Sequence, residues 1–110
     1  MDDDYGPVPW ILQGGAADWP RWLDPVSPNR WNQINIKHGP DSLAGKPRFN
    51  ADTDIAQAVF DTVVRGAPVR MDDEQRRYAL IFNGQLIEVP MRPQRGQPSR
   101  WFINNAYPNE

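Results

Sequence analysis

Proline and glycine constrain the fold of this chain more than any other feature of its sequence. Twelve prolines and eight glycines account for 20 of its 110 residues, whereas average usage would give about 13. Proline removes a backbone donor, and glycine weakens the interior of helices and strands. This content therefore favours short elements joined by turns in one small domain, and it argues against a helical bundle.

The residues that are missing exclude several kinds of chemistry. The chain has no cysteine and a single histidine, His38. Disulfides, thiolate zinc sites, thiol nucleophiles and multi-histidine metal sites are therefore excluded. We expect no metal and no cofactor, and we assign Asp72, Asp73 and Glu74 to a turn, since three consecutive acids point in different directions. No apolar run approaches the roughly 18 residues of a membrane span, so we also expect no membrane-spanning segment.

The net charge of −2 conceals an uneven distribution. Residues 1–24 are acidic, whereas the five arginines between residues 76 and 109 are opposed only by Glu88. A basic C-terminal third would suit a phosphate-binding surface. The alternative is a solvated face whose arginines pair with the acidic N-terminus.

Residues 1–30 differ from the rest of the chain. Together with Trp31 they hold four of the five tryptophans and several prolines, without sustained helix or strand periodicity. Indoles in such a segment become ordered only by packing on something else. The segment is either an arm that wraps the core or a linker to a larger carrier protein, and we place the compact domain at residues 31–110.

Two patterns predict the start of that domain. Residues 33–37 alternate polar and apolar side chains, which predicts a short half-buried strand ending at Gly39-Pro40. Residues 53–65 carry Ile55, Val59 and Val63 at helical spacing after an Asp-rich N-cap, and Gly66 follows. They predict one amphipathic helix.

The C-terminal half predicts strands. Residues 78–82 and 85–89 are strand-like runs joined by Asn83-Gly84, the dipeptide that favours a two-residue type I′ turn. An irregular, arginine-bearing loop is expected over 90–98, followed by a last strand over 101–107. Its alternation puts Trp101, Ile103, Asn105 and Tyr107 on one face. The predicted fold is α+β: a small antiparallel meander of three to four strands with the helix on one face.

His38 is the residue best suited to catalysis. Placed at an exposed edge after the strand expected over 33–37, it would titrate near neutrality and accept a proton from a ribose 2′-hydroxyl without a metal. Arginines, tyrosines and amides would stabilise the phosphorane that forms. The alternative is that a lone histidine in a loop makes only a structural hydrogen bond.

Three features resemble the C-terminal effector domains of bacterial polymorphic toxins, including contact-dependent inhibition and Rhs-type proteins. They are Lys37-His38-Gly39 before a helix, the meander after that helix, and the ending Ile103-Asn104-Asn105-Ala106-Tyr107-Pro108. Many such domains are metal-independent ribonucleases with a barnase/EndoU/colicin/RelE-like or RNase A-like fold, and they often end with a strand reading Ile-x-Thr-Ala-Tyr-Pro. The resemblance covers residues 31–110.

The resemblance implies roles for three residues. His38 matches the expected general base or acid, Tyr107 matches the closing tyrosine, and Asn105 stands where the family commonly has threonine. An amide donates a hydrogen bond to a phosphate but does not relay a proton. We add phosphate- or substrate-binding candidates from their positions in the sequence: Lys37, Arg70, Arg77, Tyr78 and Arg100. Surface ion pairs for the arginines and core packing for Tyr78 are the alternatives.

The leading hypothesis is therefore a ribonuclease toxin that cleaves RNA, by family analogy tRNA, through 2′-hydroxyl attack. It would be delivered as part of a larger secreted protein, act in the cytoplasm of the target cell, and be blocked by an immunity protein over its basic cleft. The rival hypothesis is a non-catalytic binding module, such as an immunity protein. It would grip a partner through the acidic N-terminal region, with Trp19 and Trp22 as contacts.

Overall fold

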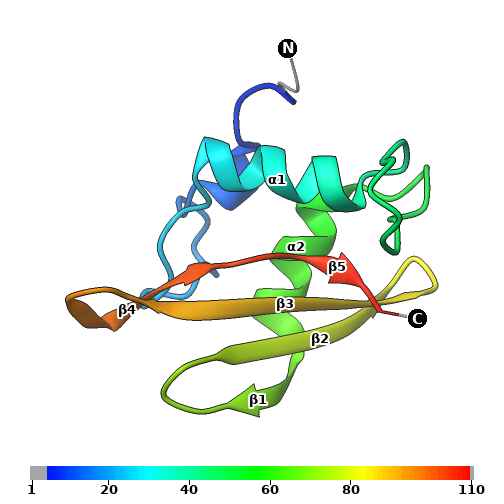
Figure 1. Cartoon of the computed structure of the whole chain (residues 1–110). Coiled ribbons are helices and arrows are strands. Elements are labelled where there is room, and N and C mark those ends of the chain that lie inside the picture. Colours follow the sequence, from blue (N-terminus) through cyan, green and yellow to red (C-terminus); the bar gives the residue numbers. More distant parts are fainter. Residues whose placement is uncertain (1–4, 110) are drawn as a thin grey trace.

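The computed structural model describes residues 5–109, and residues 1–4, with Asp2, Asp3 and Asp4 of the acidic arm, lie outside that range. The fold is α+β, as predicted: two helices and a short 3-10 turn accompany an antiparallel sheet (Figure 1). The elements are η1 Trp10–Leu12, α1 Pro28–His38, α2 Ile55–Arg65, β1 Ala67–Met71, β2 Arg76–Phe82, β3 Gln85–Gln94, β4 Gln97–Ile103 and β5 Tyr107–Pro108.

The helix predicted over 53–65 is confirmed as α2. Asp54 caps its N-terminus, since the side chain accepts a 3.1 Å hydrogen bond from the backbone N–H of Gln57. The helix ends at Gly66, whose N–H donates to Thr62 O. A Cβ on Gly66 would stand 2.4 Å from that oxygen and 2.9 Å from Ala79 O. Only glycine therefore lets the chain turn directly from α2 into the sheet.

The hairpin is also confirmed. β2 and β3 pair in antiparallel register, and Phe82 opposite Gln85 closes the turn. Asn83 has φ of 52° and Gly84 has φ of 79°, as a type I′ turn requires. α2 packs against one face of β2 and β3 and lies behind the strands in Figure 1.

The strand predicted over 33–37 is wrong, because these residues belong to helix α1. Ser27 caps this helix by accepting a hydrogen bond from Arg30 N, and Pro28 occupies its first position. Trp31, Ile34, Asn35 and His38 form its buried face, at helical spacing. The alternation over 33–37 is therefore only part of a longer helical pattern, which begins at the N-cap Ser27.

The C-terminal strands differ from the prediction in two ways. The irregular loop expected over 90–98 is instead the continuation of β3 to Gln94, followed by a tight turn into β4. The single strand expected over 101–107 is divided, with β4 and β5 pairing with different parts of β3. The segment from β4 to β5 contains one residue more than the part of β3 that it faces. Tyr107 is four positions after Ile103, whereas their partners Glu88 and Met91 are three positions apart.

That extra residue reverses the face on which Tyr107 lies, because side chains alternate with a period of two. Ile103 pairs with buried Met91 on the core face, whereas Tyr107 pairs with Glu88 on the opposite face. The expectation that Tyr107 shares a face with Trp101 and Ile103 is therefore wrong. We call the face of the sheet opposite α2 the open face.

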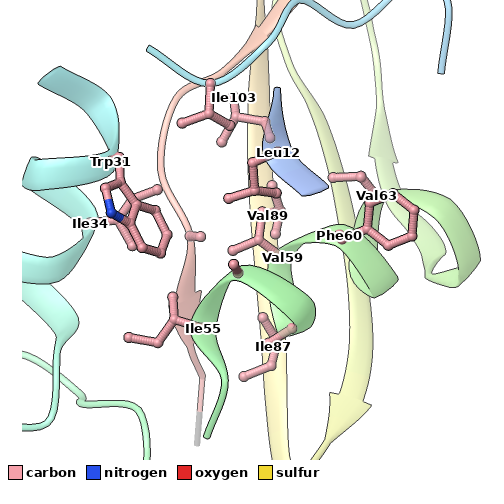
Figure 2. Close-up of a cluster of buried hydrophobic side chains, with 14 of the residues drawn as sticks. Leu12, Trp31, Ile34, Ile55, Val59, Phe60, Val63, Ile87, Val89 and Ile103 are labelled. Carbon is pink, nitrogen blue, oxygen red and sulfur yellow. The ribbon is translucent and has the colours of Figure 1, made fainter. Parts of the chain in front are cut away.

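The core lies between the helices and the sheet, and residues of the N-terminal segment contribute to it (Figure 2). Leu12 of η1 is fully buried beside Val59 and Val89. Trp19 stacks on Phe60 with ring centroids 6.3 Å apart, and Leu23 pairs with Trp101 of β4 as an isolated parallel bridge. Residues 5–27 thus wrap the core, and the boundary expected between residues 30 and 31 falls inside α1.

Candidate active site

An open pocket forms where the C-terminal end of α1, the following loop and β5 meet. Its volume is about 380 Å³. Four of the predicted site residues line it, and they come from the two halves of the sequence: Lys37, His38, Asn105 and Tyr107. Two further polar residues also line it, Lys46 and Asn109.

His38 occupies this pocket in a different way from the expected one. It is the last residue of α1 and is only 4% exposed, so the expected exposed strand edge is wrong. Its Nδ1 lies 2.8 Å from Pro47 O. Since a carbonyl only accepts hydrogen bonds, Nδ1 carries the proton and the neutral ring presents its lone pair on Nε2. Nε2 is buried and has no hydrogen-bond partner among the described residues.

The surroundings keep the His38 imidazole neutral. Burial lowers its pKa most strongly; the hydrogen bond to Pro47 opposes this, and the charges of Lys46 and Lys37 add to the lowering. A neutral imidazole with a free lone pair is a proton acceptor. The pocket thus holds His38 in the form that a general base needs.

The loop that supplies Pro47 is anchored at the two residues that directly follow this contact, Arg48 and Phe49. Phe49 is buried, and its N–H donates to His38 O at 2.8 Å. Gln85, just after the type I′ turn, donates from its side chain to Arg48 O. The tip of the hairpin therefore holds the segment whose carbonyl fixes the His38 tautomer.

Glu88 is a site residue that the sequence reasoning missed. It is only 9% exposed, although it lies on the open face of β3. Its carboxylate accepts hydrogen bonds from the Tyr107 hydroxyl at 3.3 Å and from the Asn109 amide at 2.7 Å. The Tyr107 ring also contacts the His38 ring, with centroids 5.7 Å apart. Tyr107 thus connects the imidazole to the carboxylate.

One sequence signal could have identified Glu88. The alternation of the strand predicted over 85–89 puts Ile87 and Val89 in the core and Glu88 on the other face. Which residues contact Glu88 on that face depends on the extra residue between β4 and β5, and no local sequence pattern indicates that residue.

Arg77 joins the same group from β2. Its Nη1 lies 3.7 Å from a Glu88 carboxylate oxygen. A hydrogen bond with Tyr107 is the main reason that the pKa of Arg77 is raised, and the charge of Glu88 adds to this. Its Nε is buried and has no partner among residues 5–109. Arg77 therefore brings a partly unsatisfied cation to the carboxylate and the phenol.

Among the predicted binding residues, only Lys37 lines the pocket itself. Arg70, beside Arg77 in the register of β1 and β2, pairs with Asp72 at 2.6 Å. That pairing, with the backbone N–H groups of the turn, lowers the pKa of Asp72 to about 2. Arg100 is hydrogen-bonded to the Asp24 carboxylate and to a backbone carbonyl.

Tyr78 and the two tryptophans of the rival hypothesis, Trp19 and Trp22, make aromatic contacts within the fold. Tyr78 lies on the core side of β2, where it stacks on Trp22 with centroids 6.5 Å apart. Trp22 and Trp101 also hold the Arg76 guanidinium, which lies 4.6 Å and 4.3 Å from their ring centroids. Trp19 is buried. Trp19 and Trp22 therefore stabilise the fold, and neither forms an exposed patch for gripping a partner.

The pocket thus combines a neutral imidazole, a phenol and two lysines. The Tyr107 hydroxyl connects it to the Glu88 carboxylate and the Arg77 guanidinium, which lie outside its lining. Within residues 5–109, no three potential metal ligands come together. No helix in the same range is long and apolar enough to cross a bilayer. No family model matches the chain, and no curated protein and no solved structure shows significant similarity to it. The resemblance to toxin domains remains an expectation from short motifs.

Proposed function

We propose that this chain is a metal-independent endoribonuclease whose active site is the His38 pocket. The observation that carries the proposal is the placement of His38 with a fixed Nδ1 proton and an unpartnered Nε2, beside Tyr107, in a pocket that also presents Lys37 and Lys46. RNA contains its own nucleophile, so a base and groups that stabilise the phosphorane suffice for cleavage.

The first step of the proposed reaction uses the lone pair on His38. Nε2 accepts the proton of a ribose 2′-hydroxyl, and the resulting oxygen attacks the adjacent phosphorus. The lowered pKa of His38 favours this role over that of a general acid. Because Nε2 is covered in the free protein, substrate binding has to open a path to it, while Tyr107 stays hydrogen-bonded to Glu88.

The second step expels the 5′-oxygen of the next nucleotide and leaves a 2′,3′-cyclic phosphate. The leaving oxygen takes a proton from the Tyr107 hydroxyl, which is hydrogen-bonded with the Arg77 guanidinium. Lys37, Lys46 and Arg77 offset the negative charge that develops on the phosphorane. The amide of Asn105 donates a hydrogen bond to a phosphate oxygen. Glu88 holds Tyr107 and Arg77 in place.

The biological setting belongs to the same proposal. By analogy with polymorphic toxins, the substrate would be tRNA in the cytoplasm of a target cell, and the chain would be delivered as part of a larger protein. A cognate immunity protein with an acidic surface would cover the two lysines at the pocket rim and exclude RNA.

Steady-state kinetics on a defined RNA, with EDTA present, test the assignment. His38→Ala and Tyr107→Phe should each lower kcat/KM by about 100-fold or more, which is typical of removing a proton-transfer group. Glu88→Gln should lower it less, because the amide oxygen of the new side chain still accepts the Tyr107 hydrogen bond. Arg65→Gln, on the exposed side of α2, is the control and should have wild-type kinetics. Wild-type kinetics in the His38 variant would remove His38 from the mechanism.

A further inference from the structure

The open face of the sheet extends beyond the His38 pocket in one direction. Along β3, Ile87, Val89 and Met91 are fully buried in the core. Glu88 and Arg92 therefore lie on the open face, since successive side chains point to opposite faces of a strand. Arg92 is four residues from Glu88, which is about 13 Å along the strand at ~3.3 Å per residue.

The strand register places further side chains beside these two. Glu88 pairs with Tyr107, and Arg92 pairs with Phe102 of β4. Between the two pairs lies Arg77, which is paired with Pro90. A continuous row therefore leads from the candidate active site, past the Arg77 guanidinium, to an arginine next to a phenyl ring.

The far end of this row has the composition of a binding site rather than of a packed core. Arg92, Arg95 and Phe102 line an open hollow of about 710 Å³. Phe102 is half-buried but is not one of the side chains packed on the core. Neither Arg92 nor Arg95 forms an ion pair with any residue of the described chain, in contrast to Arg70 and Arg100.

The opposite wall of the hollow is acidic. Asp73 and Glu74 of the turn between β1 and β2 line it and are exposed. These carboxylates repel phosphates, so a polyanion is favoured along the arginine side and is stopped at this turn. The charge pattern thus fits a short segment of nucleic acid.

We propose that Phe102, Arg92 and Arg95 form a flanking subsite for single-stranded RNA, a few nucleotides from the scissile bond. Phe102 stacks on one base, while the two arginines contact the adjacent phosphates. Stacking on a side chain requires a base that is not already paired and stacked in a duplex. This subsite rests on the proposed ribonuclease function and names the form of RNA that the enzyme takes.

Binding is measured separately from cleavage, with a fluorescent 2′-O-methyl hexanucleotide that lacks the nucleophile. Phe102→Leu keeps an apolar side chain but removes the π face, and it should weaken binding about tenfold, within the range found for base–aromatic stacking. Arg92→Gln should weaken binding and also flatten its dependence on salt. Asp73→Asn should tighten it. Ile81→Ala, at an exposed position of β2 near the hairpin tip, is the control and should bind as the wild type does.

Cleavage then separates the two proposals. Phe102→Leu should lower kcat/KM on the hexanucleotide RNA but not on a dinucleotide, which is too short to reach the subsite. If the wild type cleaves neither RNA, the proposed reaction fails, and the 2′-O-methyl binding result alone decides the subsite. Unchanged binding in folded Phe102→Leu and Arg92→Gln proteins overturns the subsite. It is equally overturned if the wild type does not bind the hexanucleotide, or binds the same sequence as a duplex equally well.

Discussion

Leu12→Ala tests whether the N-terminal segment is part of the fold. Leu12 is 0% exposed and lies in the core beside residues of α2 and β3 (Figure 2). The substitution removes three buried carbons, worth about 2.4 kcal/mol at ~0.8 kcal/mol each, and the cavity left behind adds to this. We therefore expect a loss of about 3 kcal/mol in the free energy of unfolding, and a fall of roughly 12 °C or more in Tm.

Urea denaturation followed by circular dichroism measures this loss. Leu43→Ala is the matched control, because Leu43 is 97% exposed, and it should change stability by less than about 0.5 kcal/mol. A loss below about 1 kcal/mol for Leu12→Ala would refute the reasoning. It would mean that the core forms without η1 and that the segment is a linker.

Three further predictions concern stability. The unfolded chain protonates His38 more readily than the folded protein does, because folding lowers the pKa of His38. The free energy of unfolding should therefore fall as the pH drops below about 6.5 and through the pKa of folded His38. Urea titrations at several pH values should show a smaller fall in the His38→Gln variant, and an equal fall would contradict this. Gly84→Ala should cost about 1 kcal/mol, because Gly84 has φ of 79°; an unchanged urea midpoint would argue against the type I′ turn. Arg76→Gln should cost about 1 kcal/mol by removing the cation between Trp22 and Trp101, whereas wild-type thermal stability would show that this contact contributes nothing.

Local signals were sufficient for the parts of the fold that were predicted correctly. The helix α2 has its N-cap, its apolar spacing and its terminal glycine within one continuous stretch. The hairpin likewise carries its turn dipeptide between two strand-like runs. Each element is therefore readable without knowledge of its neighbours.

The secondary-structure predictions that were wrong concern segments whose structure depends on residues outside the short pattern from which they were predicted. The five residues 33–37 alternate like a strand, but the Ser27 cap and the spacing of Trp31 to His38 make them helical. The prolines at 90 and 93 suggested a loop, yet β3 continues through them to Gln94. Proline is tolerated in a strand where its missing N–H is not needed for pairing.

The candidate site was only partly accessible from the sequence. His38, Asn105 and Tyr107 were selected by motif. The fold brings them together, although His38 ends a helix and Asn105 lies outside the strands. Glu88 and Asn109 reach the candidate site because of the register between β3 and β5. Lys46 reaches it because the hairpin tip holds the loop that carries it. Such relations depend on tertiary pairing, which short-range patterns do not encode.

Incubation of the purified chain with RNA in EDTA, followed by analysis of the product ends, tests the central claim most directly. The proposed mechanism predicts fragments with 2′,3′-cyclic phosphate and 5′-hydroxyl ends from the wild type and none from folded His38→Ala protein. Intact RNA after incubation with folded wild-type protein, or equal cleavage by the His38→Ala variant, would contradict it.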